Sequence, residues 1–133
     1  NYTDAVYEYR RELELHEGNL LAMIALGTVL LEARKLEEAR ELLGRAMQLA
    51  PQAAEPVHLL GQANYLLKNY DGAVALLQRA TKIDSGNPLI YKRLGQAYRA
   101  VGRPQDAASA FQRYLDLAPD APDREEIKKL MRN

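Results

Sequence analysis

The feature that most constrains the fold of this chain is a repeat with a period of 34 residues. The tetrapeptide LGQA at residues 60–63 recurs at 94–97, and its first two residues also occur at 26–27. A fixed period of this size is typical of solenoid proteins, in which each repeat is one small motif stacked on its neighbours. The repeat therefore predicts an elongated stack of similar units.

The same period divides the whole chain into segments. Three complete units occupy residues 20–53, 54–87 and 88–121, and residues 1–19 align without a gap with the end of an earlier unit. We interpret residues 1–19 as the second helix of an incomplete unit. The simplest explanation is a fragment of a longer repeat protein, and the alternative is a natural half-unit that serves as a cap. Residues 122–133 form a charged segment with a narrow apolar stripe, which predicts a capping helix.

Each complete unit predicts two helices. In residues 88–121, Asn87 and Pro88 provide a cap residue and a first helical residue, and apolar residues then recur at helical spacing. The sequence Gly102-Arg103-Pro104 ends that helix before a second one begins. The sequence therefore predicts three helical hairpins.

Small residues recur inside the predicted helices. Gly27, Gly61 and Gly95 each lie in a first helix, where glycine costs about 1 kcal/mol relative to alanine. Such a cost is tolerable if the two helices of a hairpin cross closely at this point. The predicted small residues opposite them on the second helices are Ala39, Ala73 and Ala107.

The pattern of large and small residues resembles the tetratricopeptide repeat. The match is complete in residues 88–121, at Tyr91, Leu94, Gly95, Tyr98, Ala107, Phe111 and Pro119. Residues 54–87 depart from it at Asn64 and Ser85. The resemblance implies an all-α fold: a right-handed superhelix of stacked helical hairpins, with three full units, an N-terminal half unit and a C-terminal capping helix.

The resemblance also implies a concave groove lined by the fifth, ninth and twelfth residues of each unit. These residues are Ile24, Thr28, Leu31, His58, Gln62, Tyr65, Lys92, Gln96 and Arg99. The set changes from apolar to basic along the chain, and it lies outside the positions expected to form the hairpin cores. For the apolar residues of the first unit, packing against an upstream helix or another chain is an open alternative. For Lys92 and Arg99, the alternative is a solvated surface.

Some members of this family hold the C-terminal carboxylate of chaperones with a clamp of lysine, asparagine and arginine. Only Arg93 matches that clamp here. The other clamp positions hold Ile24, Thr28, Leu59 and Leu89. The sequence therefore predicts that this chain does not bind chaperone tails in that way.

Composition and motifs limit the other functions. Eighteen basic residues balance eighteen acidic ones, which argues against nucleic-acid binding. The chain has no cysteine and two distant histidines, and it lacks phosphate-binding motifs, so we expect no enzyme activity, metal or cofactor. Its longest uncharged run, residues 20–31, is shorter than the about 20 residues that a membrane span needs. The absence of cysteine fits the cytoplasm and the periplasm equally well, so the compartment is left open.

The sequence thus predicts a protein-interaction scaffold that binds a peptide or protein segment in its groove. Two alternatives remain open: a self-assembly module, and a regulatory repeat region of a larger multidomain protein. Self-association is expected at the N-terminal end, where apolar side chains lack a preceding helix to cover them. The candidate residues for this contact are Tyr2, Val6, Tyr9, Leu20 and Leu21.

Overall fold

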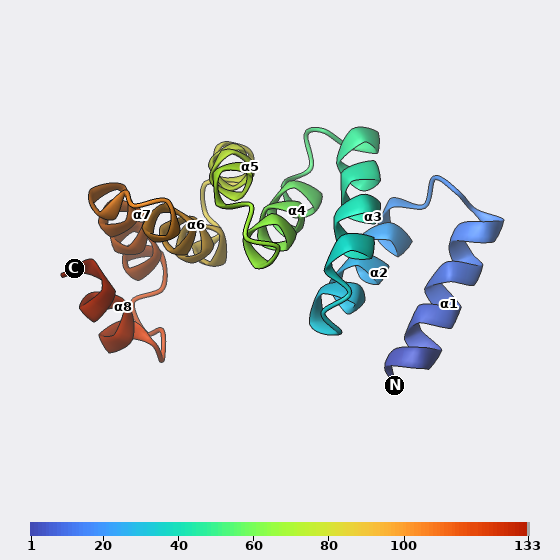
Figure 1. Cartoon of the computed structure of the whole chain (residues 1–133), viewed down its shortest axis with the longest axis horizontal. Helices are drawn as coiled ribbons and strands as arrows, with labels where there is room; N and C mark the ends of the chain where they lie inside the picture. The colour runs from blue at the N-terminus through green and yellow to red at the C-terminus, as the bar shows by residue number, and fades with distance from the viewer. Residues whose placement is uncertain (133) are drawn as a thin grey trace.

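The computed structural model of the chain describes residues 1–132 and consists of eight α-helices without a strand in that range. The helices are α1 (Tyr2–Leu15), α2 (Leu20–Glu32), α3 (Leu36–Leu49), α4 (Ala54–Leu66), α5 (Tyr70–Ile83), α6 (Pro88–Ala100), α7 (Pro104–Leu117) and α8 (Arg124–Met131). They follow one another along the long axis of the molecule, with α1 and α8 at opposite ends (Figure 1). The predicted all-α superhelix of stacked hairpins is confirmed.

Neighbouring helices in the sequence are also neighbours in space. The pairs α2–α3, α4–α5 and α6–α7 form the three hairpins, and each hairpin packs against the next. The first helices α2, α4 and α6 also contact one another in turn. Helix α1 packs on α2, and α8 packs on α7, so each extra helix lies on the outermost hairpin of its end.

Local chemistry fixes where the helices begin and where the hairpins turn. The predicted cap is confirmed, because the side-chain oxygen of Asn87 accepts a hydrogen bond of 3.1 Å from the backbone N–H of Leu89. The turn within each hairpin contains one residue with a left-handed backbone. These residues are Arg34, Lys68 and Gly102, with φ angles of 64°, 67° and 78°. Of the three, only Gly102 is a glycine, for which this conformation carries no steric cost.

The close helix crossing predicted at the repeated glycines is also confirmed. A β-carbon added to Gly61 would lie 2.8 Å from Cγ of Leu77, and one added to Gly95 would lie 2.6 Å from the ring of Phe111. The large side chain sixteen residues after each glycine lies directly over it, as expected for a large residue that packs at the crossing. The repeated alanines of the second helices, such as Ala73, are fully buried.

The buried side chains form two clusters. An N-terminal cluster joins α2, α3 and part of α4, and a C-terminal cluster runs from α4 to α8. Helix α1 contributes no fully buried residue, although Val6, Tyr9 and Leu13 pack partly against the N-terminal cluster. The two ends of the stack are therefore held with different strength.

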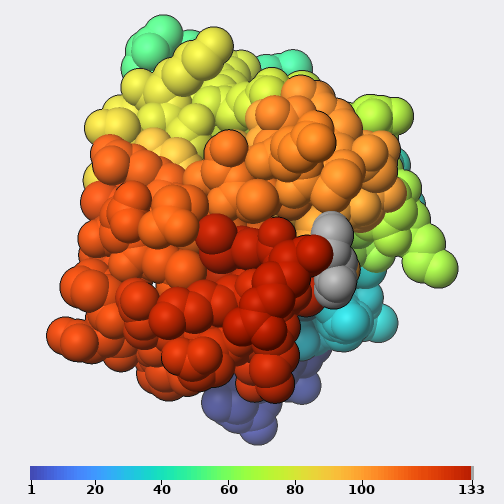
Figure 2. Space-filling view, turned by 90° about the vertical axis from the view of Figure 1, so that its left-hand side faces the viewer, coloured from blue at the N-terminus to red at the C-terminus, as the bar shows by residue number. Residues whose placement is uncertain are grey.

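Helix α8 covers the C-terminal end of the stack, and Figure 2 shows it there against the residues of α7. Its Ile127 is buried in the C-terminal cluster. Just before α8, the Asp123 carboxylate accepts a 2.6 Å hydrogen bond from the Tyr114 hydroxyl and lies 2.6 Å from Nζ of Lys92. The helix is shorter than the predicted cap at 122–133, and Asn133 lies outside the described residues.

Candidate functional site

The candidate site is the face formed by the first helices of the three hairpins. The nine residues predicted to line a groove lie on α2, α4 and α6, at equivalent positions of each helix. Arg99 is exposed, and six others are half-buried: Ile24, Thr28, Gln62, Tyr65, Lys92 and Gln96. The remaining two, Leu31 and His58, are buried.

Leu31 belongs to the core. It is 8% exposed and lies in the N-terminal cluster, together with Leu60 and Ala63 of the next unit. The expectation that no residue of the groove set serves the core is therefore wrong at this position. The physical reason is that an apolar side chain near the end of α2 gains more by packing on α4 than by facing solvent.

Tyr65 is divided between the core and the surface. Its ring packs partly against the C-terminal cluster and meets the ring of Tyr70 edge to face, with centroids 5.4 Å apart. Such a pair adds to the packing energy of the two rings. Tyr65 therefore helps to hold α4 against α5 and keeps part of its surface available.

His58 is not an open groove residue, because it is only 6% exposed. Its Nε2 lies 2.8 Å from Nη1 of Arg93, and since a guanidinium only donates, the imidazole nitrogen accepts this hydrogen bond. Burial, and then the nearby charge of Arg93, lower the pKa of His58 from 6.5 to about 4. The imidazole is therefore neutral at pH 7.

Arg93 thus carries its charge without a charged partner. The side chain is half-buried, and burial lowers its pKa from the usual value. Within residues 1–132 it takes part in no ion pair, since its neighbour His58 is neutral. In the sequence, Arg93 stands out only as a partial match to a clamp. Its spacing from His58, one period plus one residue, is the signal that could indicate their contact across two units.

Lys92 points its charge toward α8. Its Nζ pairs with Asp123 and lies 5.8 Å from the centre of the Tyr114 ring. The pair with Lys92 and the hydrogen bond from Tyr114 lower the pKa of Asp123 from its usual value. The same hydrogen bond, assisted by burial, raises the pKa of Tyr114 to about 12. Lys92 therefore has a structural partner in Asp123, whereas the sequence predicts either a groove contact or a solvated surface for Lys92.

The ninth residues of the units give the face a polar centre. Thr28 donates a 2.9 Å hydrogen bond to the backbone oxygen of Ile24 and so satisfies its own helix. Gln62 differs, because its Oε1 is buried and accepts no hydrogen bond from any residue between 1 and 132. An unsatisfied buried acceptor is unusual in a folded protein. Because the Gln62 side chain is half-buried, its rotation would bring this oxygen to an incoming donor.

The N-terminal residues predicted for self-association fall into two groups. Tyr2 and Leu21 are 41% and 79% exposed. Val6, Tyr9 and Leu20 instead pack partly against the N-terminal cluster. Their apolar surface is thus already shared with α2 and α3, and the exposed part of this end is smaller than the sequence indicates.

Two other kinds of site are absent from the described part of the chain. No group of three or more histidine, cysteine or acidic side chains there could hold a metal ion. None of the helices from α1 to α8 has the length and apolar character that crossing a bilayer requires.

Comparisons with known proteins agree with this architecture. Profiles of the tetratricopeptide repeat match residues 1–54, 24–88 and 65–133. Tetratricopeptide repeat protein 17 of Homo sapiens is 37% identical over 92 residues, which are 68% of this chain and 8% of that protein. The chain thus spans a small part of the length of this relative.

Solved structures show the same fold. The crystal structure of MamA is similar with a TM-score of 0.85 and 22% identity, over 98% of this chain and 85% of that one. The first repeat domain of Spaghetti (RPAP3), bound to an HSP90 peptide, is similar with a TM-score of 0.79 and 21% identity, over 85% and 90% of the two chains. Together with the matched profiles, the stacked hairpins and their buried glycines lead to one conclusion: the chain belongs to the tetratricopeptide repeat family.

Proposed function

We propose that this chain is a protein-interaction scaffold that binds a segment of another protein along the face formed by α2, α4 and α6. The observation that carries the proposal is Arg93, a half-buried guanidinium on this face without an ion pair among residues 1–132. A buried charge is costly unless it is paired. A carboxylate of a bound partner would supply the missing partner.

The proposed contact surface keeps the nine predicted residues but divides their roles. Arg99 and Gln62 are assigned to the partner, because one is exposed and the other has an unsatisfied acceptor. Ile24 supplies an apolar contact at the α2 end. Leu31 and His58 act indirectly, by holding the helices and Arg93 in place. The preferred segment is therefore apolar where it meets α2 and acidic where it meets α6.

This segment differs from a chaperone tail of the kind bound by the RPAP3 domain. Of the clamp residues used for such tails, this chain has only Arg93, and leucine or isoleucine stands at three of the other positions. Leu59 and Leu89 cannot donate hydrogen bonds to a terminal carboxylate. We propose that an acidic side chain inside the partner segment, rather than a chain terminus, meets Arg93.

The remaining parts of the proposal follow from the same face. It holds no nucleophile paired with a base, so we assign no catalytic step and no cofactor to these repeats. Since the chain spans 8% of the human relative, we propose that it is the binding part of a longer protein. A regulatory role within such a protein would use the same groove.

The test begins with peptides selected from a random displayed library against the immobilised chain. Acidic residues should be enriched among the binders. The double variant Ile24→Ser with Arg99→Ala should weaken binding about tenfold or more, because both changes fall on the proposed surface. The matched control is Leu49→Ser with Arg40→Ala, which changes an exposed leucine and an exposed arginine on α3.

Equal weakening by the two double variants would contradict binding on this face. Selection of peptides without acidic residues would contradict the role of Arg93. Circular dichroism of both variants controls for loss of structure, and little loss is expected, since three of the four changed side chains are exposed and Ile24 is half-buried.

The second candidate function is self-association through the N-terminal end. It is supported by the exposure of Leu21 at 79% and of Tyr7 at 60%, which leaves apolar area beside the partly buried Val6. The expected result is a mass that rises with protein concentration in light scattering and returns to that of one chain in Leu21→Lys. Leu49→Lys serves as the control, and a monomeric parent at high concentration would contradict this candidate.

A further inference from the structure

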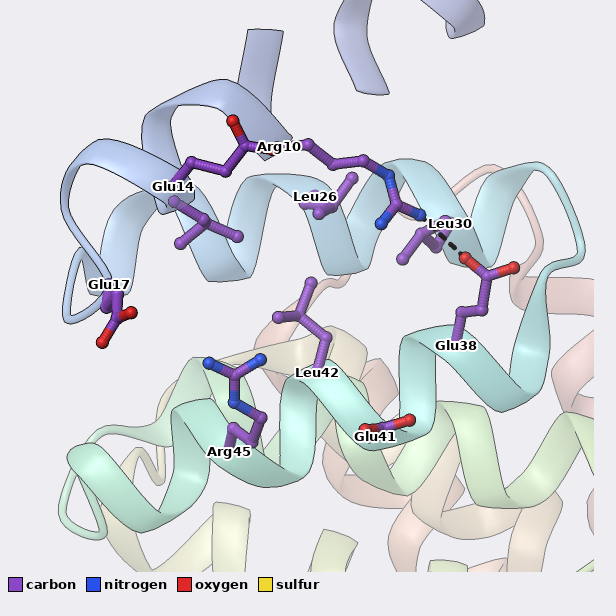
Figure 3. Close-up of a pocket in the computed structure, with 10 residues that line it drawn as sticks. Arg10, Glu14, Glu17, Leu26, Leu30, Glu38, Glu41, Leu42 and Arg45 are labelled. Atoms are coloured by element: carbon purple, nitrogen blue, oxygen red, sulfur yellow. Dashed lines mark hydrogen bonds and ion pairs between the residues drawn. The ribbon is translucent and has the colours of Figure 1, made fainter. Parts of the chain in front are cut away.

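A cleft opens between α1, α2 and α3, on a part of the molecule that the groove does not use. Its volume is about 520 Å³. Figure 3 shows Leu26 and Leu30 of α2 and Leu42 of α3 on its inner side, with charged side chains of α1 and α3 around them. An apolar floor is thus surrounded by a polar rim.

The cleft lies on the other side of α2 from the groove. Ile24 and Thr28 belong to the groove set, and Leu26 and Leu30 each follow them by two residues. Two residues correspond to about 200° around a helix. A molecule bound in the cleft would therefore not compete for the groove residues of α2.

The rim of the cleft is acidic. Arg10 of α1 and Glu38 of α3 pair across it at 2.9 Å, which leaves three further glutamates and Arg45 in the lining. These glutamates are Glu14, Glu17 and Glu41, and within residues 1–132 none of them forms an ion pair. Residues 1–19 as a whole carry five acidic and two basic residues, so the field at this end favours cations.

The equivalent residues of the next hairpin are arranged differently. One period after Arg45, Arg79 donates a 2.7 Å hydrogen bond to the backbone oxygen of Pro51. Pro51 is the equivalent of Glu17 in the next unit. Within the described chain, Arg45 donates no equivalent hydrogen bond to the backbone of Glu17. One more period along, Arg113 instead lies 5.7 Å from the centre of the ring of Tyr91.

Residue size distinguishes the third junction but not the second. Leu30 forms part of the cleft floor, one period later the same position holds Asn64, and two periods later it holds the larger Tyr98. The acidic lining described above belongs to the first junction.

We infer that this cleft is a second protein-binding surface, which takes a cationic segment of a partner protein. Lysine and arginine side chains combine an aliphatic stem with a terminal charge, and they lie favourably where apolar surface adjoins acidic groups. Here the stem lies against the half-buried Leu13 and the small exposed parts of Leu26, Leu30 and Leu42. The charge lies among Glu14, Glu17 and Glu41. The acidic rim distinguishes this partner from the acidic segment proposed for the groove.

The experiment uses a fluorescent peptide with two Arg-Leu-Lys repeats, and a second peptide in which glutamate replaces each basic residue. Only the basic peptide should bind in the cleft, whereas the acidic peptide suits the groove, and the affinity of the basic peptide should fall as salt is raised. In isotope-labelled protein, the amide signals of residues 10–17 and 38–45 should shift, and those of α6 should not.

The variant that tests the rim is Glu14→Gln with Glu41→Gln. Its affinity for the basic peptide should fall by about two- to thirtyfold, the range expected for losing two charge pairs near the surface. The matched control is Glu8→Gln with Glu32→Gln, which removes the same charge from exposed glutamates outside the cleft. The control should bind nearly as well as the parent.

Several results would overturn the inference. One is equal weakening by both double variants, since that would reflect overall charge alone. Another is absence of binding by the basic peptide, or shifts confined to α4 and α6. Amide shifts in α1 and α3 that follow protein concentration without peptide would mean that a second copy fills the cleft, and the inference would be wrong.

Discussion

Replacement of Gly61 by alanine should destabilise the chain, although alanine is the better helix former. A β-carbon at this position would lie 2.8 Å from Cγ and 3.1 Å from Cδ2 of Leu77, whereas carbon atoms pack best at about 3.5–4.0 Å. Leu77 is fully buried and cannot move toward solvent. Overpacking of this kind costs about 1–3 kcal/mol, against a gain of about 1 kcal/mol in helix propensity. The net loss should be about 0–2 kcal/mol.

A second glycine separates the two contributions. Gly44 lies inside α3, and a β-carbon there would meet no atom within 4 Å. Gly44→Ala should therefore stabilise the chain by up to about 1 kcal/mol. The difference between the two variants, about 1–3 kcal/mol, then measures the crossing contact alone.

Urea unfolding followed by circular dichroism is the appropriate assay, with parent and variants in one buffer. The midpoint should rise for Gly44→Ala and fall, or remain unchanged, for Gly61→Ala. Gly61→Leu should fall further, because its larger side chain meets the same buried Leu77. The reasoning is refuted if Gly61→Ala stabilises the chain as much as Gly44→Ala does.

The remaining predictions concern ionisation and backbone shape. In an NMR titration, the His58 ring should have its midpoint near pH 4. Because its pKa is lowered in the folded state, the free energy of unfolding should fall as pH drops from about 6.5 toward 4. A titration midpoint near 6.5 would contradict the burial of His58. Asp123→Asn should return the pKa of Tyr114 from about 12 toward 10 in an ultraviolet titration, and an unchanged titration would exclude the hydrogen bond as its cause. Because the pKa of Asp123 is lowered in the folded state, its carboxylate stabilises the fold fully above its usual pKa near 4. This stabilisation is lost as pH falls through the lower pKa of the folded state. The protection of the α8 amides from hydrogen exchange should therefore decrease in acid. Gly102→Ala should lower the free energy of unfolding by about 1 kcal/mol, because the backbone at Gly102 is left-handed. Lys68→Ala should change it by less than about 0.5 kcal/mol, since lysine and alanine both carry a β-carbon. Equal effects of the two variants would count against this account.

The elements that could be predicted from the sequence are those that recur with the period. Gly61 and Gly95 occupy the same position in successive units, so one packing argument covers both, and the structure bears it out. Asn87 before Pro88 is likewise a local signal, because a helix cap requires only its own first turn. Local and periodic features of this kind determine the hairpins.

The candidate site could be predicted less well, because its chemistry joins residues of different units. The contact of His58 with Arg93 depends on how far α6 is rotated relative to α4, which no residue pattern within one unit specifies. The pair of Lys92 with Asp123 depends in turn on how α8 docks beyond the last complete unit. The position of Leu31 in its unit predicts a groove residue, but its apolar character is the stronger indication of where it lies.

The unequal anchoring of the two ends determines the order in which the stack comes apart. Helix α1 has no fully buried residue, whereas α8 is held by Ile127 and by the carboxylate of Asp123. Each helix contacts only near neighbours, so detachment of α1 leaves the hairpins from α4 to α7 intact. A protease should therefore trim the chain from α1 inward, and a pulling force applied at both ends should release the N-terminal helix first.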